Sequence, residues 1–205
     1  MPDAYIVRNM VEAEQREFAE LLRGLTPGDW ETPSLCDGWS VHEAVIHIAI
    51  HSHTASIERF LQLARVRFSD DRLHAPERTR KPDQLIAWLE SPATLVGEST
   101  LVRLSELMVH QQDVRRPLGA KREIPAERLA VVLDFGITRF GGFAVAGARH
   151  RAKGLRLIAT DLSWSAGTGP EVTGPGEAIF MALNGRGHAV ADLLGAGVDT
   201  LAARL

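Results

Sequence analysis

Glu106 and His110 are the two side chains whose types and spacing most directly suggest metal chemistry. They lie four residues apart in SELMVHQQDVRRPLG, a segment with the apolar pattern of a helix, so both should project from one helical face. His47, in GWSVHEAVIHIAIH, offers a third ligand from another expected helix. Two nitrogens and one oxygen would leave one position open on a tetrahedral zinc ion, as in catalytic sites. The alternative is an ordinary i,i+4 pair on a solvated helix face.

Three neighbouring residues are candidates for supporting roles. His51 lies one turn beyond His47 and would either close the site as a fourth ligand or line a pocket beside it. Asp113 could accept a hydrogen bond from the second nitrogen of a ligand imidazole. Cys36, in the loop before the His47 helix, is either a small packed residue or a group for redox or thiol-exchange chemistry.

Arg115 and Arg116 end the helix that carries His110. Their planar guanidinium groups could bind a carboxylate of a small ligand through paired hydrogen bonds. The alternative interpretation is helix C-terminal charge placed against the macrodipole. Zinc is the first choice of metal for two nitrogens and one oxygen, although other divalent ions fit the same donors.

The elements that must position these residues are mainly helical. Ser40 and Glu43 form a capping-box pattern that predicts a helix running from Ser40 to about Phe68. The charged, proline-containing stretch SDDRLHAPERTRKPDQ after it predicts a surface loop. Further helical patterns cover about 4–25, 83–89, 98–114 and 126–140. The first ~145 residues therefore predict four or five helices in a bundle with one long connection.

The composition changes after about residue 150, where we expect a domain of residues 1–150 to give way to a small α/β appendage of residues 151–205. GLRLIATDLSW alternates apolar and polar residues like a strand, AGTGP predicts a turn, and EVTG a short partner strand. GEAIFMALNG predicts a helix closed by Gly185, followed by one or two short helices. A two-stranded hairpin is marginal alone, so it should pack on the bundle.

The bulk properties of the 205 residues narrow the functional classes. A net charge of −3 and a pI near 6.2 argue against binding nucleic acid or an anionic membrane. Cys36 is the single cysteine, which excludes an intramolecular disulfide and fits a reducing cytoplasm. The first residues lack the apolar region of a signal peptide, and no apolar run is long enough to span a membrane. We therefore expect a cytoplasmic protein; the sequence leaves a homodimer open.

Two motifs carry a family resemblance. TPSLCDGWSVHEAVIHIA resembles the first signature of the mycothiol-dependent maleylpyruvate isomerase N-terminal family, and SELMVHQQDVRRPLG resembles its second. The tail LNGRGHAVADLLGAGVDTLAARL is similar to the C-terminal end of actinobacterial members. The family belongs to the DinB-like metal-binding superfamily, so the resemblance implies an antiparallel four-helix bundle.

The resemblance also implies chemistry. It implies a zinc-type site of His47, Glu106 and His110, with mycothiol as co-substrate and a small electrophile as second substrate. Arg186 resembles an arginine that the related isomerase uses near its metal; the alternative is a solvent-exposed arginine after a helix end. The short appendage argues against maleylpyruvate itself as the substrate.

Three functions are consistent with this sequence. The first is a metal-dependent thiol transferase or isomerase, in which a thiolate adds to an electrophilic carbon. The second is a metal- or small-molecule-binding helical protein without turnover. The third is a metal-dependent hydrolase that uses bound water instead of a thiolate.

Overall fold

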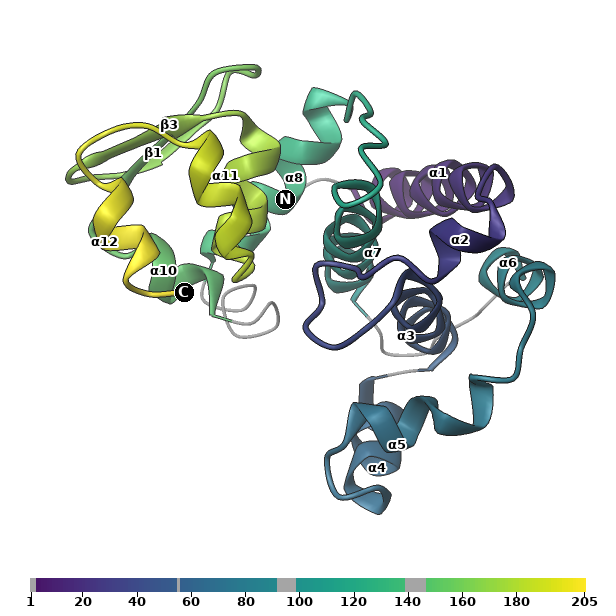
Figure 1. Cartoon of the computed structure of the whole chain (residues 1–205). Helices are drawn as coiled ribbons and strands as arrows, with labels where there is room; N and C mark the ends of the chain where they lie inside the picture. Colours follow the sequence, from purple (N-terminus) through teal and green to yellow (C-terminus); the bar gives the residue numbers. More distant parts are fainter. Residues whose placement is uncertain (1–2, 55, 92–98, 139–146) are drawn as a thin grey trace. The chain divides into compact units, whose positions relative to one another are not determined.

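The computed structural model describes residues 3–54, 56–91, 99–138 and 147–205. These residues form two compact units, one of Ala4–Lys121 and one that begins at Arg122 (Figure 1). The division lies about 30 residues ahead of the expected 150/151 boundary. The reason is that helix α8 (Ala126–Ile137) packs against α10 (Ala148–Ala152) and α11 (Gly176–Leu183), which belong to the second unit.

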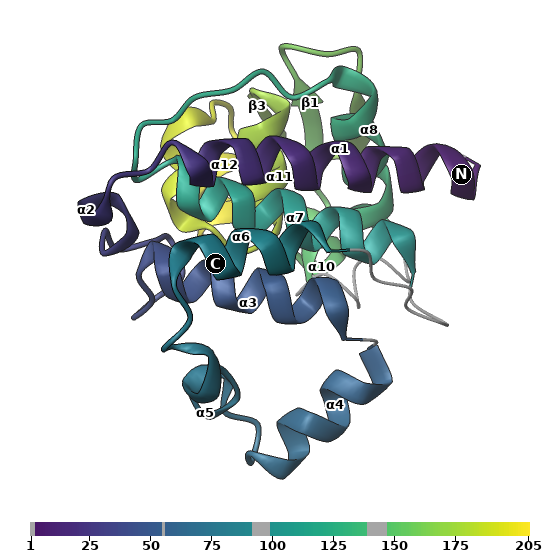
Figure 2. The same ribbon diagram turned by 90° about the vertical axis from the view of Figure 1, so that its right-hand side faces the viewer.

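Four helices make the bundle of the first unit: α1 (Ala4–Arg23), α3 (Val41–His53), α6 (Pro82–Glu90) and α7 (Thr100–Arg115). Helix α1 packs against α6 and α7, and α3 packs against the same two helices, so all four share one core (Figure 2). The fully buried side chains of this core include Phe18, Leu22, Ile46, Leu85, Leu89, Leu104 and Met108. The predicted mainly helical fold with a small α/β part is confirmed.

Helix α3 begins as its sequence predicts. The Ser40 hydroxyl accepts a hydrogen bond from the backbone N–H of Glu43, and the Glu43 carboxylate accepts one from the Ser40 N–H. This reciprocal capping box satisfies two backbone donors that a helix start leaves without partners. It fixes where the helix begins, so His47 follows one turn after Glu43.

The predicted single helix from Ser40 to Phe68 is wrong, because the structure has two helices there. Helix α3 ends at His53, and α4 covers Ser56–Arg65. Thr54 between them has extended backbone angles, φ −122° and ψ 120°. Serine and threonine favour non-helical local hydrogen bonds, so Ser52, Thr54 and Ser56 weaken the helix without a glycine or proline to mark its end.

The predicted surface loop after residue 68 is also wrong in part. It contains the short helix α5 (Asp70–His74) and the 3₁₀ helix η1 (Ala75–Glu77). The Ser69 hydroxyl caps α5 by accepting a hydrogen bond from the backbone N–H of Arg72. Helix α5 packs against α3, and the His74 side chain is fully buried. Upstream, the predicted loop before α3 contains a further short helix, α2 (Pro27–Trp30).

The second unit holds a sheet of three strands, not the predicted two. Strand β1 (Arg156–Ala159) lies between β2 (Ser165–Gly167), which is antiparallel to it, and β3 (Glu171–Gly174), which is parallel. The sequence predicted a turn at the end of β2 because Gly167 lies there. In the structure Gly167 has a φ of +78°, and an added Cβ would lie 2.2 Å from the Leu155 carbonyl oxygen. Only glycine fits there.

The end of the chain follows its expected pattern. Helix α11 stops at Leu183, and Gly185 adopts a positive φ of 87° just beyond it. The 3₁₀ helix η2 (Gly187–Asp192) and helix α12 (Val198–Ala202) follow. Among the described helices, none has both the length and the apolar character needed to cross a membrane.

Candidate metal site

His47, Glu106 and His110 come together inside the bundle of the first unit. Helix α3 supplies His47 and the adjacent helix α7 supplies the other two. One donor atom from each lies within 4.8 Å of the others. Both histidines are buried, whereas the Glu106 side chain keeps 24% of its exposure. The structure thus brings together the three residues that the sequence selected.

The spacing of the donor atoms suits a shared ion. Glu106 Oε2 lies 3.5 Å from His110 Nε2, which is longer than a good hydrogen bond. Zinc bonds of about 2.0–2.2 Å in a tetrahedron place two ligands roughly 3.4 Å apart. The observed separation is close to that value. The Glu106 carboxylate and the His110 imidazole therefore sit at the distance that two ligands of one ion require.

The second nitrogen of His110 is held by Asp113 on the same helix. Asp113 Oδ2 lies 2.9 Å from His110 Nδ1 and also accepts a hydrogen bond from the Cys36 thiol at 3.2 Å. Burial disfavours the charged imidazole, but the contacts with Asp113 and Cys36 and the nearby negative charge of Glu106 favour it more strongly, so the pKa of His110 lies well above its usual value. The sequence-based role of Asp113 as the partner of a ligand imidazole matches this contact.

The second nitrogen of His47 is held by His74, which the sequence analysis missed. His47 Nδ1 lies 3.2 Å from His74 Nε2, across a separation of 27 residues. Burial lowers the pKa of His74 below its usual value, and the nearby negative charge of Asp70 opposes the shift only in part. The Trp39 ring packs on both imidazoles, with centroids 4.9 Å from His47 and 4.8 Å from His74.

A signal for His74 was present in the sequence. Ser69 followed by two aspartates in SDDRLH is a helix-start pattern, with an N-cap residue and acidic side chains in the first turn. The prolines and charges around it predicted a loop instead. Once α5 is recognised, its last residue is a histidine with an apolar neighbour, Leu73, which is the type of position that packs back onto the bundle.

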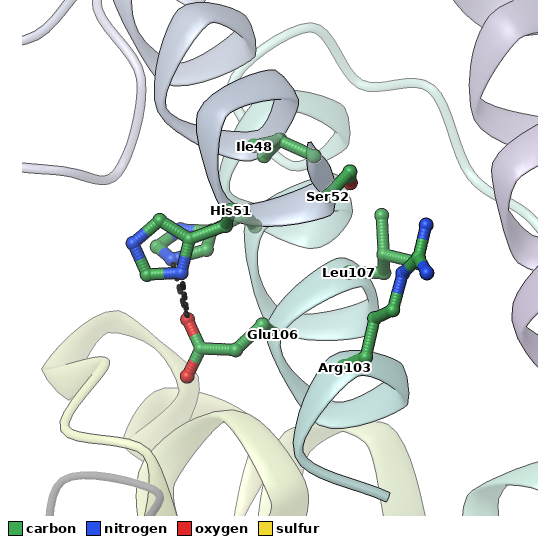
Figure 3. Close-up of a pocket in the computed structure, with 7 residues that line it drawn as sticks. Ile48, His51, Ser52, Arg103, Glu106 and Leu107 are labelled. Atoms are coloured by element: carbon green, nitrogen blue, oxygen red, sulfur yellow. Dashed lines mark ion pairs between the residues drawn. The ribbon is translucent and has the colours of Figure 1, made fainter. Parts of the chain in front are cut away.

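His51 lies beside the three-residue group. Its Nδ1 is 3.5 Å from Glu106 Oε2, and its ring centroid lies 4.1 Å from that of His47. With Ile48, Leu107 and other residues it lines a cavity of about 10 Å³, roughly the space of one water molecule. Figure 3 shows His51 and Glu106 reaching toward each other from α3 and α7, while Arg103 extends away from that carboxylate.

Two other groups of described residues also have donor atoms within 4.8 Å of one another. Cys36, His110 and Asp113 form one, and His47, Asp70 and His74 form the other. Each shares a histidine with the first group and includes the residue to which that histidine is hydrogen-bonded, Asp113 for His110 and His74 for His47. The group with Glu106 leaves both of those hydrogen bonds intact, so we favour it for the ion.

The candidate ligand-binding arginines lie in different settings. The Arg115 guanidinium donates to Gln111 Oε1 at 2.7 Å and to the backbone carbonyls of Glu17 and Ala120, so it ties α7 to α1 and to the following loop. Arg116 is half-buried and caps the end of α7. Arg186 belongs to the second unit, where its Nη1 donates to the Asn184 carbonyl at 2.7 Å.

Comparison with known proteins adds family and fold. Residues 11–98 match the family model described as the mycothiol maleylpyruvate isomerase N-terminal domain, so the resemblance in the sequence is confirmed. Two solved structures, mycothiol-dependent maleylpyruvate isomerase and a histidine-to-alanine variant of it, match with a TM-score of 0.61. Both have 15% identity and cover 95% of this chain and 93% of theirs, which shows a shared fold. No curated protein matches this chain by sequence.

Proposed function

Because residues 11–98 belong to the mycothiol maleylpyruvate isomerase N-terminal domain family, we propose that this protein is a divalent-metal-dependent thiol transferase or isomerase. Its co-substrate is a low-molecular-weight thiol, mycothiol by family, and its second substrate is a small electrophile. The observation that carries the proposal is that donor atoms of His47, Glu106 and His110, from two helices, lie within 4.8 Å of one another.

The donor set fits zinc on chemical grounds. Two imidazoles and one carboxylate are a common ligand set for catalytic zinc, which leaves one position for an exogenous group. Neutral histidines and one carboxylate leave a net charge of +1 on the centre, which favours an anion in that position. The partners Asp113 and His74, each on the second nitrogen of a ligand histidine, match the usual support of metal-bound imidazoles.

The residues at the site have separate proposed roles. His47, Glu106 and His110 would hold the ion. A bound zinc ion supplies the positive charge that keeps a thiol deprotonated at neutral pH. Ile48 and Leu107 form apolar walls of a cavity with room for about one water molecule, so they limit the access of competing water to this point. His51 stands beside Glu106 and orients its carboxylate.

Arginines are assigned to the substrates. We assign Arg115 and Arg116, the two arginines at the end of α7, to the thiol; the Arg115 guanidinium also makes three hydrogen bonds within the bundle, to Gln111, Glu17 and Ala120. Arg186 is assigned to the negative charge of the electrophile, on the strength of its resemblance to the arginine of the related isomerase. A planar guanidinium suits a carboxylate through two parallel hydrogen bonds.

The test begins with the metal content of the purified protein. The metal-loaded protein is then given a chlorinated nitrobenzene as a generic electrophile, with mycothiol, glutathione or bacillithiol as the thiol. We expect conjugation that requires both the metal and mycothiol and stops when the ion is chelated. Arg186→Ala should reduce turnover while the metal content stays unchanged.

Two outcomes would overturn the proposal. If no low-molecular-weight thiol binds the metal-loaded protein at millimolar concentration, the protein is not a thiol transferase or isomerase of the proposed kind. Hydrolysis of esters by the metal-loaded protein without any thiol would favour a hydrolase instead. Loss of metal in the Arg186→Ala protein would make that arginine a structural residue.

A further inference from the structure

His74 is a buried polar residue whose placement calls for an explanation. Its side chain is fully buried, its Nε2 lies 3.2 Å from His47 Nδ1, and its Nδ1 has no hydrogen-bond partner among the described residues. A buried polar atom without a partner costs stability, of the order of 1–3 kcal/mol. A leucine or phenylalanine would avoid that cost. The histidine is therefore expected to do something that an apolar residue cannot do.

The hydrogen bond between the two rings restricts where their protons sit. One ring must provide an N–H and the other a lone pair. If His47 is to bind an ion through Nε2, that nitrogen must be unprotonated, so the neutral ring carries its proton on Nδ1. The acceptor for this proton is then His74 Nε2. The opposite direction would place the His47 proton on Nε2 and block the ion.

Ion pairs and an aromatic ring hold His74 in place. Arg78, just after η1, pairs with Glu43 in the first turn of α3 at 3.0 Å and also with Asp71 in α5. Glu43 precedes His47 by one turn. The ion pairs therefore fasten α5 to the part of α3 that carries His47. Trp39 packs against both imidazoles and limits the rotation of each ring.

We propose that His74 is a positioning residue for His47: it accepts a hydrogen bond from the His47 Nδ1–H, selects the tautomer with an unprotonated Nε2, and fixes the plane of the ring toward the ion. This role rests on the metal site proposed above. Residues that orient a ligand histidine in this way typically change metal affinity about 10- to 100-fold when they are replaced.

Three variants of His74 test the role. His74→Phe keeps a ring for Trp39 to pack on but removes the acceptor. His74→Gln can place an amide oxygen where Nε2 stood, whereas the shorter His74→Asn reaches only the place of Nδ1. His53→Phe is the control, because His53 lies on α3, the helix of His47, but its imidazole contacts Ala49 and Ser91 and not His47 or His74.

Zinc affinity is measured by competition with a chelating indicator, together with the thermal midpoint of each metal-free protein. We expect one ion per wild-type chain, a loss of affinity of about 10- to 100-fold in His74→Phe and His74→Asn, and a loss of only a few-fold in His74→Gln. His53→Phe should bind like wild type. Nitrogen-15 NMR of the zinc-loaded wild type should show the His47 proton on Nδ1, protected from exchange, and this protection should disappear in His74→Asn.

Each contrary result has a distinct meaning. Wild-type affinity in His74→Phe, or in His74→Asn where the phenylalanine variant does not fold, would overturn the role of His74 and leave the metal site standing. An equal loss in all three variants would make His74 a packing residue. Two ions per wild-type chain, with one of them lost in His74→Phe, would make His74 a metal ligand together with His47 and Asp70 and overturn the positioning role. A wild type that binds no divalent ion would remove the metal site and this role with it.

Discussion

The α7 side of the proposed site and its α3–α5 side support a ligand histidine by different means. On α7, His110 is held by Asp113, a carboxylate three residues further along the same helix. On the other side, His47 is held by the imidazole of His74, which comes from a separate short helix. A carboxylate partner raises the proton affinity of its imidazole, as the raised pKa of His110 shows. A neutral imidazole adds no such charge.

The difference shows that one site can hold its two ligand histidines in two ways, one through a partner on the same helix and one through a partner that tertiary packing supplies. The α7 side is local, because helical geometry alone places Glu106, His110 and Asp113 on one face. The α3–α5 side depends on tertiary structure, because His74 reaches His47 only when α5 is folded against α3. Elements that rest on few buried contacts open at lower free energy than core helices. We therefore expect the His47 side to be the first to lose its geometry under mild destabilisation.

The largest effect should come from removing a ligand. His47→Ala, Glu106→Ala and His110→Ala should each lower zinc affinity more than about 100-fold, beyond the usual effect of a residue that only supports a ligand. Metal analysis after dialysis measures this, and circular dichroism should show that the helices survive. Full metal occupancy in Glu106→Ala would exclude Glu106 as a ligand and so overturn the proposed three-residue site.

A smaller effect is expected from the carboxylate on the α7 side. Asp113→Asn keeps the shape of the side chain but replaces the charged acceptor that serves both His110 and Cys36. We expect zinc affinity to fall about 10- to 100-fold. The metal-free protein should lose about 1–3 kcal/mol of stability, since a buried charge-assisted hydrogen bond is weakened. Cys36→Ala, which leaves the His110–Asp113 contact intact, is the control. It should lose less zinc affinity and less stability than Asp113→Asn.

The pH dependence of the metal-free protein should come from the same side. Because the folded pKa of His110 is raised, its protonated form adds stability that is fully present below the unfolded pKa, near 6.5, and is lost as the pH rises through the folded pKa. Denaturant unfolding between these two values should therefore show stability falling with pH. In Asp113→Asn this fall should shift to lower pH. An unchanged profile would mean that Asp113 does not set the proton affinity of His110.

The smallest effect should come from the ion pairs that fasten α5. Arg78 is 38% exposed and pairs with Glu43 and Asp71, so water and salt screen much of the attraction. Arg78→Ala should lower the thermal midpoint slightly and loosen the His47 side, seen as faster hydrogen exchange in α5 but not in α7. High salt should mimic the substitution. Arg23→Ala, which breaks an exposed pair with Glu90 between α1 and α6, should leave exchange in α5 unchanged.

The contrast between local and tertiary support also explains which residues of the site could be predicted from the sequence. The α7 side was predictable, since Glu106, His110 and Asp113 need only helical periodicity to be placed on one face. His47 was found because the capping box of Ser40 and Glu43 fixed its helix. His74 was missed because no local pattern connects it to His47 over 27 residues, and only packing brings α5 to α3.

The rest of the fold divides in the same way. Patterns with a clear start or stop, such as the end of α11 at Gly185, were read correctly. The break at Thr54 and the strand β2 were missed, because neither carries the residues that usually mark such features. Thr54 ends a helix without glycine or proline, and β2 ends in a glycine that its close approach to Leu155 demands. A tertiary contact decided the second, whereas the first follows from the local preferences of Ser52, Thr54 and Ser56, a weaker signal than a glycine or proline.

The position of Trp39 gives this site an optical read-out of its own. Its indole lies against the rings of both His47 and His74, one a proposed ligand and the other its partner. The fluorescence of an indole depends on the charge and rigidity of the groups on its face. In a protein where Trp30, Trp88 and Trp164 are replaced by phenylalanine, the emission of Trp39 would report the protonation of these two imidazoles in the metal-free state. The arrival of an ion could then be followed in real time, without any added label.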